Sequence, residues 1–270
     1  MTTLQRTLAE ARAAGRAALI GYYPAGFPDV ESSIRIVREM VAGGCDVVEV
    51  GLPYSDPTMD GPVIQQAADR ALAAGTTPKD VFAVVRAVAE AGAAALVMSY
   101  WNPIERYGVD AFAADMAAAG GSGVITPDLI PEEAGPWISA SDAAGLDRIF
   151  LVAPSSTDRR LKLTCDASRG FVYAASLMGV TGTRDKVAAT ARKLVERTRE
   201  ATRDSGLPIC VGLGISNGDQ AAEVASYADG VIVGTGFCRR VLDAPDLDTA
   251  CARVRSFAAE LAEGVRAAAR

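Results

Sequence analysis

The chain has 270 residues, of which 50% are hydrophobic, 6% aromatic and 22% charged. Its formal net charge is −6, and no long block of Lys and Arg gives it an electrostatic footprint for nucleic acid or an anionic membrane. It contains no histidine, which excludes Ser-His and Cys-His nucleophile pairs and the usual zinc ligands, so proton transfer must rest on Asp, Glu, Lys, Tyr or Cys.

The N-terminal segment is polar and predicts a helix over residues 2–14. It has no apolar signal core, and no later apolar run approaches the roughly 18 residues of a membrane span. The five cysteines are scattered without a Cys-x-x-Cys pair, which is typical of a reducing compartment. We therefore expect a cytoplasmic protein.

Strand and helix patterns alternate along the rest of the chain. Short runs rich in Val, Ile, Leu and Ala predict eight strands, at 17–23, 45–51, 93–100, 122–127, 148–153, 170–175, 208–213 and 229–234. Helical spacing lies between and after them, at 29–43, 61–74, 78–92, 108–119, 131–144, 156–168, 185–205, 217–226 and 247–268. This alternation predicts a single (β/α)8 TIM barrel over residues 1–270 with an extra N-terminal helix. A doubly wound open sheet is the alternative, because periodicity does not show whether a parallel sheet closes.

The second predicted strand carries an acid in an apolar setting. Glu49 shares strand parity with Val47 and Gly51, which places it in the barrel lumen near the end where barrel chemistry gathers. Burial there would raise its pKa toward the range of an acid or base working at neutral pH. The alternative is a glutamate at a strand end that pairs with an arginine.

Two more acids follow in the loop after this strand. Asp60 precedes Gly61 and Pro62, so it is a candidate either for a cap of the next helix or for the more solvated partner of Glu49 in a catalytic pair. Asp56 precedes Pro57, which favours an extended and exposed turn, so we expect it at the surface or at an interface.

Glycine-rich loops follow the last three predicted strands, at 179–184, 212–217 and 234–236. Glycines let backbone N–H groups approach an anion, and the loops after strands 7 and 8 form the usual phosphate site of such barrels. The alternative is turn geometry alone, because tight turns also need glycine. We expect a small organic phosphate as ligand, and we expect no metal ion.

Tyr100 and Tyr173 lie at or near strand ends, where they could line a pocket or simply pack. Asp128 follows the fourth predicted strand and could accept a hydrogen bond from the ligand or from a loop. The four lysines fall outside the predicted strands, so we do not expect imine chemistry.

Several motifs together resemble the tryptophan synthase alpha chain family over nearly the whole sequence. They are Glu-Val-Gly-Leu-Pro-Tyr-Ser-Asp-Pro at 49–57, Asp-Gly-Pro at 60–62, Met-Ser-Tyr-Trp-Asn-Pro at 98–103, Pro-Asp-Leu at 127–129, Ser-Leu-Met-Gly-Val-Thr-Gly at 176–182 and Val-Gly-Leu-Gly-Ile-Ser at 211–216. The resemblance implies a TIM barrel that cleaves indole-3-glycerol phosphate to indole and D-glyceraldehyde 3-phosphate by a retro-aldol step, with no cofactor in this chain. It implies that Glu49 is the general acid and base and that Asp60 binds the indole N–H.

The resemblance also implies roles for residues around this pair. Gly182, Gly214, Gly234 and Thr235 match phosphate-binding positions, Tyr22 and Tyr173 match pocket aromatics that contact substrate, and Thr181 matches a lid residue that meets Asp60. Pro53, Asp56, Asn102 and residues 128–133 match the surface that docks a tryptophan synthase beta chain, which uses pyridoxal phosphate, usually in an α2β2 assembly. The sequence departs from the family pattern at Thr58, Ala174, Ala175 and Thr235, and none of these departures removes a catalytic group.

Two other functional readings remain open from the sequence. The chain could be a subunit that keeps the barrel and the partner surface but turns over poorly, although it retains both Glu49 and Asp60. It could also be a lyase that works without a partner and releases free indole.

Overall fold

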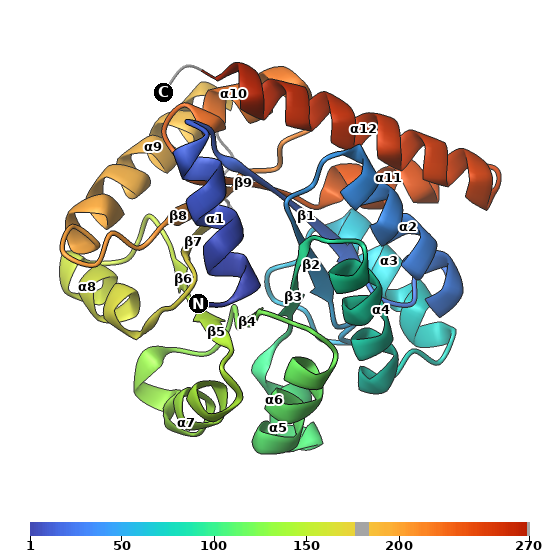
Figure 1. Ribbon diagram of the computed structural model, residues 1–270, viewed down its shortest axis with the longest axis horizontal. Coiled ribbons are helices and arrows are strands. Elements are labelled where there is room, and N and C mark those ends of the chain that lie inside the picture. The colour runs from blue at the N-terminus through green and yellow to red at the C-terminus, as the bar shows by residue number, and fades with distance from the viewer. Residues whose placement is uncertain (176–183, 269–270) are drawn as a thin grey trace.

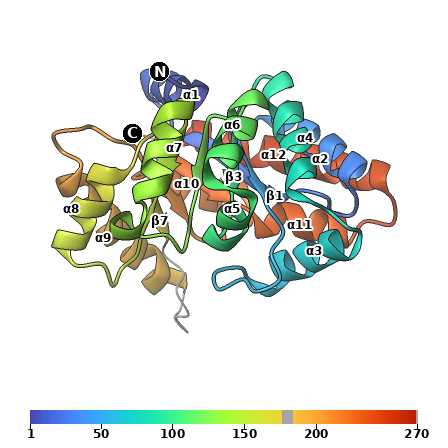
Figure 2. The same cartoon turned by 90° about the horizontal axis from the view of Figure 1, so that it is seen from below.

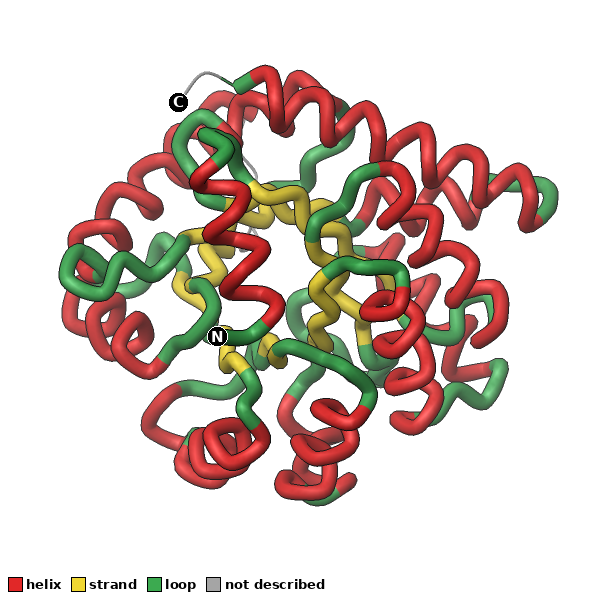
Figure 3. Tube along the Cα trace, in the orientation of Figure 1, coloured by secondary structure: helices red, strands yellow, loops and turns green. Residues whose placement is uncertain are grey.

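The computed structural model describes residues 1–175 and 184–268. Parallel strands form a ring at its centre, and helices surround that ring (Figure 3). The strands are β1 (Ala18–Pro24), β2 (Val47–Gly51), β3 (Ala94–Met98), β4 (Gly123–Ile125), β5 (Asp147–Ile149), β6 (Leu151–Val152), β7 (Val172–Ala175), β8 (Ile209–Gly212) and β9 (Gly230–Val233). Their order in the sheet is β5-β4-β3-β2-β1-β9-β8-β7-β6, and every paired neighbour is parallel.

Strands β5 and β6 together correspond to the single strand predicted at 148–153. Only Phe150 separates them, and the chain hydrogen-bonds to a different neighbour on each side of it. The Thr126 N–H donates to the Ile149 carbonyl at 3.2 Å, whereas the Tyr173 N–H donates to the Phe150 carbonyl at 3.1 Å. The two edges of the sheet therefore meet in one continuous segment. The barrel prediction is confirmed, and the open-sheet alternative is wrong.

The helices follow the predicted alternation, with two additions. They are α1 (Thr3–Ala13), α2 (Val30–Gly43), α3 (Pro62–Ala73), α4 (Pro78–Glu90), α5 (Trp101–Tyr107), α6 (Val109–Ala118), the 3-10 helix η1 (Pro131–Glu133), α7 (Gly135–Ala144), α8 (Asp158–Ala167), α9 (Arg184–Ala201), α10 (Gly218–Ala225), α11 (Thr235–Leu242) and α12 (Leu247–Ala267). The patterns did not predict α5 and α11. Helix α5 has only seven residues, and α11 begins two residues after β9 ends, which leaves little separation between the strand pattern and the helix pattern. Within the described ranges, no helix is long and apolar enough to cross a membrane.

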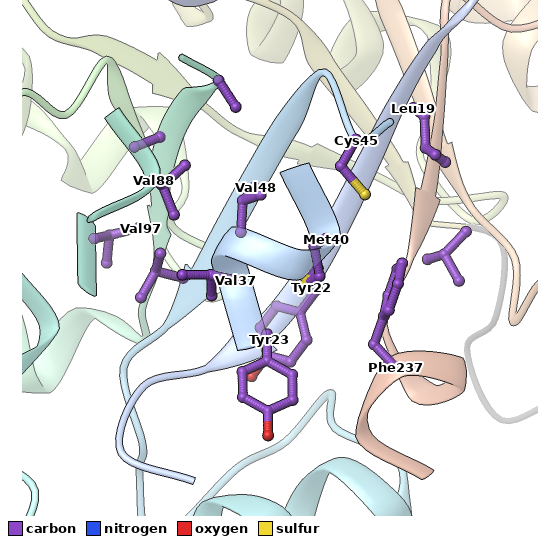
Figure 4. Close-up of a cluster of buried hydrophobic side chains, with 14 of the residues drawn as sticks. Leu19, Tyr22, Tyr23, Val37, Met40, Cys45, Val48, Val88, Val97 and Phe237 are labelled. Carbon is purple, nitrogen blue, oxygen red and sulfur yellow. The ribbon is translucent and has the colours of Figure 1, made fainter. Parts of the chain in front are cut away.

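Two hydrophobic layers hold the barrel together. Side chains such as Ile20, Leu96 and Ile232 fill the lumen, while Leu19 and Val48 point outward to the helices. Because both faces of each strand are buried, the strands read as continuous apolar runs. Figure 4 shows part of the outer layer, where side chains from α2 and α11 pack with those from the first strands.

Helix α1 closes one end of the barrel (Figure 1). Its residues Leu4, Leu8 and Ala11 are buried in the same cluster as the lumen residues. Its N-terminal turn is held by Asp147 of β5, whose carboxylate accepts hydrogen bonds from the Thr2 hydroxyl and, at 2.7 Å, from the Gln5 side-chain amide. Figure 2 shows α1 at one end of the molecule and α3 at the other. The end opposite α1 is therefore left for the loops that follow the strands.

Candidate active site

A cavity of about 320 Å³ lies at the end of the barrel where the strands finish. Its walls bring together seven of the residues that the sequence singled out: Tyr22, Glu49, Asp60, Tyr173, Gly214, Gly234 and Thr235. A larger hollow of about 610 Å³ lies beside α1 at the opposite end and holds none of them. We place the chemistry in the smaller cavity, because β/α barrels carry their active sites at the C-terminal ends of their strands.

Glu49 sits in the middle of β2, where its backbone pairs with Tyr22 on one side and Leu96 on the other. Its side chain lines the cavity, yet the residue is 0% exposed and neither carboxyl oxygen has a hydrogen-bond partner among the described residues. Burial raises the pKa of Glu49 to about 8. The carboxyl group is therefore mostly protonated at neutral pH, and the alternative of a structural pair with arginine is wrong.

Asp60 lies in the loop between β2 and α3 and reaches the same cavity. It does not cap α3, because the N-cap residue is Gly61 and no side chain provides a cap hydrogen bond there. Burial raises the pKa of Asp60, and a hydrogen bond with Tyr100 opposes that rise. The two carboxyl groups therefore experience different environments, as a pair with divided roles requires.

Tyr100, a candidate to line a substrate pocket, is not among the residues that line the cavity. Its hydroxyl oxygen accepts hydrogen bonds from the backbone N–H groups of Thr58, at 3.1 Å, and Met59, at 2.9 Å. Its ring packs against Tyr54, with ring centroids 5.2 Å apart. Tyr100 thus lies behind the loop that carries Asp60 and holds that loop against β3.

The opposite wall of the cavity is suited to an anion. It contains Gly214, whose φ of +64° favours glycine, and the N-terminus of α11 with Gly234 and Thr235. The first N–H groups of a helix have no partner within the helix and carry the positive end of its dipole. No Lys or Arg of the described residues lines this cavity, so backbone groups would carry the binding of a phosphate.

Apolar side chains complete the cavity, and of these only Ala175 stood out in the sequence, as a departure from the family pattern. They are Met59, Ile64, Met98, Leu151, Leu213 and Ile232, together with Ala175. Most of them lie at or next to strand ends, and this position could have identified them, because the cavity lies where the strands end. Thr181 and Gly182 lie outside the described residues.

The predicted partner surface divides into exposed and buried residues. Asp56 and Asn102 are exposed, and the Asn102 amide donates to the Tyr54 hydroxyl at 3.3 Å. Pro53 is buried. Asp128 caps the start of α5 by accepting a hydrogen bond from the Trp101 N–H at 2.9 Å, and nearby Ile130 is 45% exposed.

Comparisons with known proteins point to one family. The sequence model of the family described as "Tryptophan synthase alpha chain" matches residues 8–266. A curated protein of that name from Thermobifida fusca is 87% identical over 270 residues, which is 100% of both chains, and one from Acidothermus cellulolyticus is 59% identical over 98% of both.

Solved structures agree with these sequence matches. A chain of Mycobacterium tuberculosis tryptophan synthase superposes with a TM-score of 0.90 at 52% identity, covering 98% of both chains. Tryptophan synthase subunit alpha from Legionella pneumophila superposes with a TM-score of 0.88 at 30% identity, again over 98% of both chains.

Proposed function

The chain belongs to the tryptophan synthase alpha chain family, and we propose that Glu49 and Asp60 carry out this family's reaction in the cavity of about 320 Å³. The reaction is a lyase step of tryptophan biosynthesis, the cleavage of indole-3-glycerol phosphate to indole and D-glyceraldehyde 3-phosphate. The observation that carries the assignment is the Glu49 carboxyl group, which faces the cavity, is fully buried and has no partner among the described residues.

Protonated Glu49 begins the reaction. It delivers its proton to C3 of the indole ring, and the ring becomes an indolenine whose nitrogen carries positive charge. Asp60, ionised, accepts the hydrogen bond of the indole N–H and stabilises that charge. The Glu49 carboxylate then removes the proton of the side-chain hydroxyl next to the ring. The bond between C3 and the side chain breaks, its electron pair returns to the ring, and the hydroxyl carbon becomes the aldehyde of the second product.

The phosphate of the substrate occupies the opposite wall in this proposal. Gly214, Gly234 and Thr235 offer backbone N–H groups there, and Gly182 belongs to the same set by the family pattern. Thr181 would meet Asp60 from the same segment. Tyr173, which lines the cavity from β7, contacts the bound substrate. No residue of this chain is assigned a metal or an organic cofactor.

Membership of this family implies a tryptophan synthase beta chain as partner. We propose an α2β2 assembly in the cytoplasm, in which the beta chain carries pyridoxal phosphate and condenses the indole with serine. Exposed Asp56, Asn102 and Ile130 support a docking surface beside the Asp60 loop. Pro53, which is buried, would shape that loop rather than contact the partner directly.

Turnover with and without the partner tests this proposal. The purified chain is given indole-3-glycerol phosphate, first alone and then with a beta chain, serine and pyridoxal phosphate, and indole and tryptophan are measured. We expect slow release of indole alone and a much faster flux to tryptophan with the beta chain. Absence of both products above background would support the non-catalytic subunit, and equal rates with and without partner would support a lyase that works alone. Light scattering of the mixture checks the α2β2 mass.

A further inference from the structure

Tyr22 lines the cavity between its phosphate end, at Gly234, and the strand that carries the catalytic carboxyl. The residue is 8% exposed and pairs in register with Glu49 of the neighbouring strand. Its ring lies against Gly234, where an added Cβ would be 3.1 Å from a ring carbon. Its hydroxyl lies over Gly51, where an added Cβ would be 2.3 Å from the oxygen. Gly51 is two residues beyond Glu49 on the same face of β2, so the hydroxyl occupies the lumen layer above that carboxyl.

Tyr22 lines the cavity, and its hydroxyl oxygen is not among the fully enclosed polar atoms of the described residues, so a ligand in the cavity can reach it. Burial and the negative charge of Asp60 raise the pKa of Tyr22 well above its ordinary value, so the hydroxyl keeps its proton at neutral pH and can donate a hydrogen bond. The adjacent Tyr23 points the other way, and its hydroxyl donates to the Phe27 carbonyl at 2.9 Å (both rings are labelled in Figure 4). A hydroxyl that a ligand can reach, and that keeps its proton, can donate a hydrogen bond to an acceptor of that ligand.

The substrate has polar groups for which the proposed function gives no complete set of protein partners. Its phosphate lies at Gly214 and Gly234, its indole N–H at Asp60, and the proton of one side-chain hydroxyl goes to Glu49. The three-carbon side chain must run from Gly234 toward Glu49, and this is the path that Tyr22 covers. The hydroxyl oxygens of this side chain are acceptors without an assigned donor.

We propose that the Tyr22 hydroxyl donates a hydrogen bond to a hydroxyl oxygen of the three-carbon side chain of the substrate, and that Tyr22 thereby selects for a hydroxylated chain. This inference rests on the proposed function, because it takes the substrate and its orientation from there. It assigns the hydroxyl of Tyr22 a role of its own, beyond that of a pocket aromatic.

Binding to two ligands tests the proposal. Indole-3-glycerol phosphate is compared with indole-3-propanol phosphate, which keeps the ring and the phosphate but lacks both hydroxyls. Calorimetric titrations use the Glu49→Gln chain, in which turnover is blocked, with and without Tyr22→Phe. We expect Tyr22→Phe to weaken binding of the hydroxylated ligand about 5- to 10-fold, as for one lost hydrogen bond. Binding of the propanol ligand should change by less than about 2-fold, because that ligand offers no acceptor.

The control variant is Tyr23→Phe, which removes a hydroxyl from the same strand but from the side away from the cavity. Tyr23→Phe should not weaken binding of the hydroxylated ligand relative to binding of the propanol ligand. An equal change for both ligands on Tyr22→Phe, or no change for either, overturns the proposal while leaving the proposed function intact. If the Glu49→Gln chain binds neither ligand, the proposed function fails and this inference fails with it. Binding of the propanol ligand also reports that each variant has a folded cavity.

Discussion

Burial raises the pKa of both Glu49 and Asp60, but only Asp60 has a neighbour whose hydrogen bond opposes the rise. Glu49 is at 0% exposure and has no described partner, and its pKa rises to about 8. Asp60 keeps some exposure and receives a hydrogen bond from Tyr100, which holds its pKa closer to the ordinary range. The apolar run around Glu49 was enough to predict a buried acid. The Tyr100 contact was not predictable, because the two residues are 40 positions apart and meet only through the pairing of β2 with β3.

The two pKa shifts predict a bell-shaped dependence of kcat/KM on pH. The rate should fall as pH rises above about 8, because Glu49 then loses the proton that it must deliver to the indole carbon. It should also fall at low pH, at a point above the ordinary range of an aspartate, because Asp60 must be ionised. Initial rates measured from the lowest pH at which the chain stays folded up to pH 10 check both limbs, and a rate that keeps rising past pH 9 would contradict the assignment of Glu49 as proton donor.

The same group makes stability depend on pH. Because the pKa of Glu49 rises from 4.5 to about 8 on folding, the folded chain holds a proton that the unfolded chain has lost in that window. The stabilising contribution is therefore complete below pH 4.5 and is lost as pH rises toward 8. Glu49→Gln has no group that titrates at this position, so it should not show this loss. The difference in free energy of unfolding between variant and parent should therefore shift in favour of the variant by ~2–4 kcal/mol when the pH is raised from 5 to 9. Urea unfolding of both proteins at pH 5 and at pH 9 measures this shift. The same change in free energy of unfolding with pH in the variant and in the parent would contradict the prediction.

At the scale of elements, strand register decides which side chains share the cavity. Tyr22 lies opposite Glu49, and Ala175 lies opposite Gly212, so neighbouring strands place their functional residues in matched layers. The strand pattern predicted that Glu49 faces the lumen, but the register that sets Tyr22 opposite it comes from the structure. Helix α11 was not predicted, because it starts so close to the end of β9 that its periodicity cannot be separated from the strand pattern. Its N-terminus nevertheless forms part of the cavity wall that is suited to an anion.

The contact between β7 and β8 leaves no room for a side chain at Gly212. A Cβ there would lie 2.4 Å from the Tyr173 hydroxyl oxygen. We predict that Gly212→Ala displaces Tyr173 and lowers kcat/KM by about 10²-fold, with partial recovery on adding Tyr173→Phe. Gly135→Ala is the matched control, since a Cβ at Gly135 meets nothing within 4 Å. If Gly212→Ala keeps the parental kcat/KM, the packing of Tyr173 on Gly212 does not shape the site.

Helix α1 should contribute stability without contributing to chemistry. Asp147→Ala removes the acceptor of the Thr2 and Gln5 hydrogen bonds, and we predict a loss of about 1–3 kcal/mol in the free energy of unfolding. The value of kcat should not change, because α1 closes the end of the barrel opposite the cavity. Glu10→Ala, on an exposed position of the same helix, is the control for denaturant unfolding and for activity. If Asp147→Ala lowers kcat under conditions in which the variant is still folded, the two ends of the barrel are coupled and the prediction is wrong.

At the scale of the whole molecule, the two ends of the barrel are specialised. One end is closed by α1, and the other holds the cavity together with the exposed residues Asp56, Asn102 and Ile130. The alternation of apolar runs predicted the barrel, and the family motifs predicted the partner. Closure of the sheet was beyond the sequence pattern, because it depends on how Phe150 and its neighbours divide their hydrogen bonds between β4 and β7.

The central claim is that the buried Glu49 carboxyl transfers the proton while other groups bind the substrate. The most direct test measures kcat and substrate affinity on the same samples of Glu49→Gln and the parent chain, each with a saturating beta chain. We predict that affinity for indole-3-glycerol phosphate changes by less than about 3-fold, whereas kcat falls by at least about 10²- to 10⁴-fold, the usual contribution of a general acid and base. A near-parental kcat in Glu49→Gln, or a loss of activity explained wholly by weaker binding, would contradict the account.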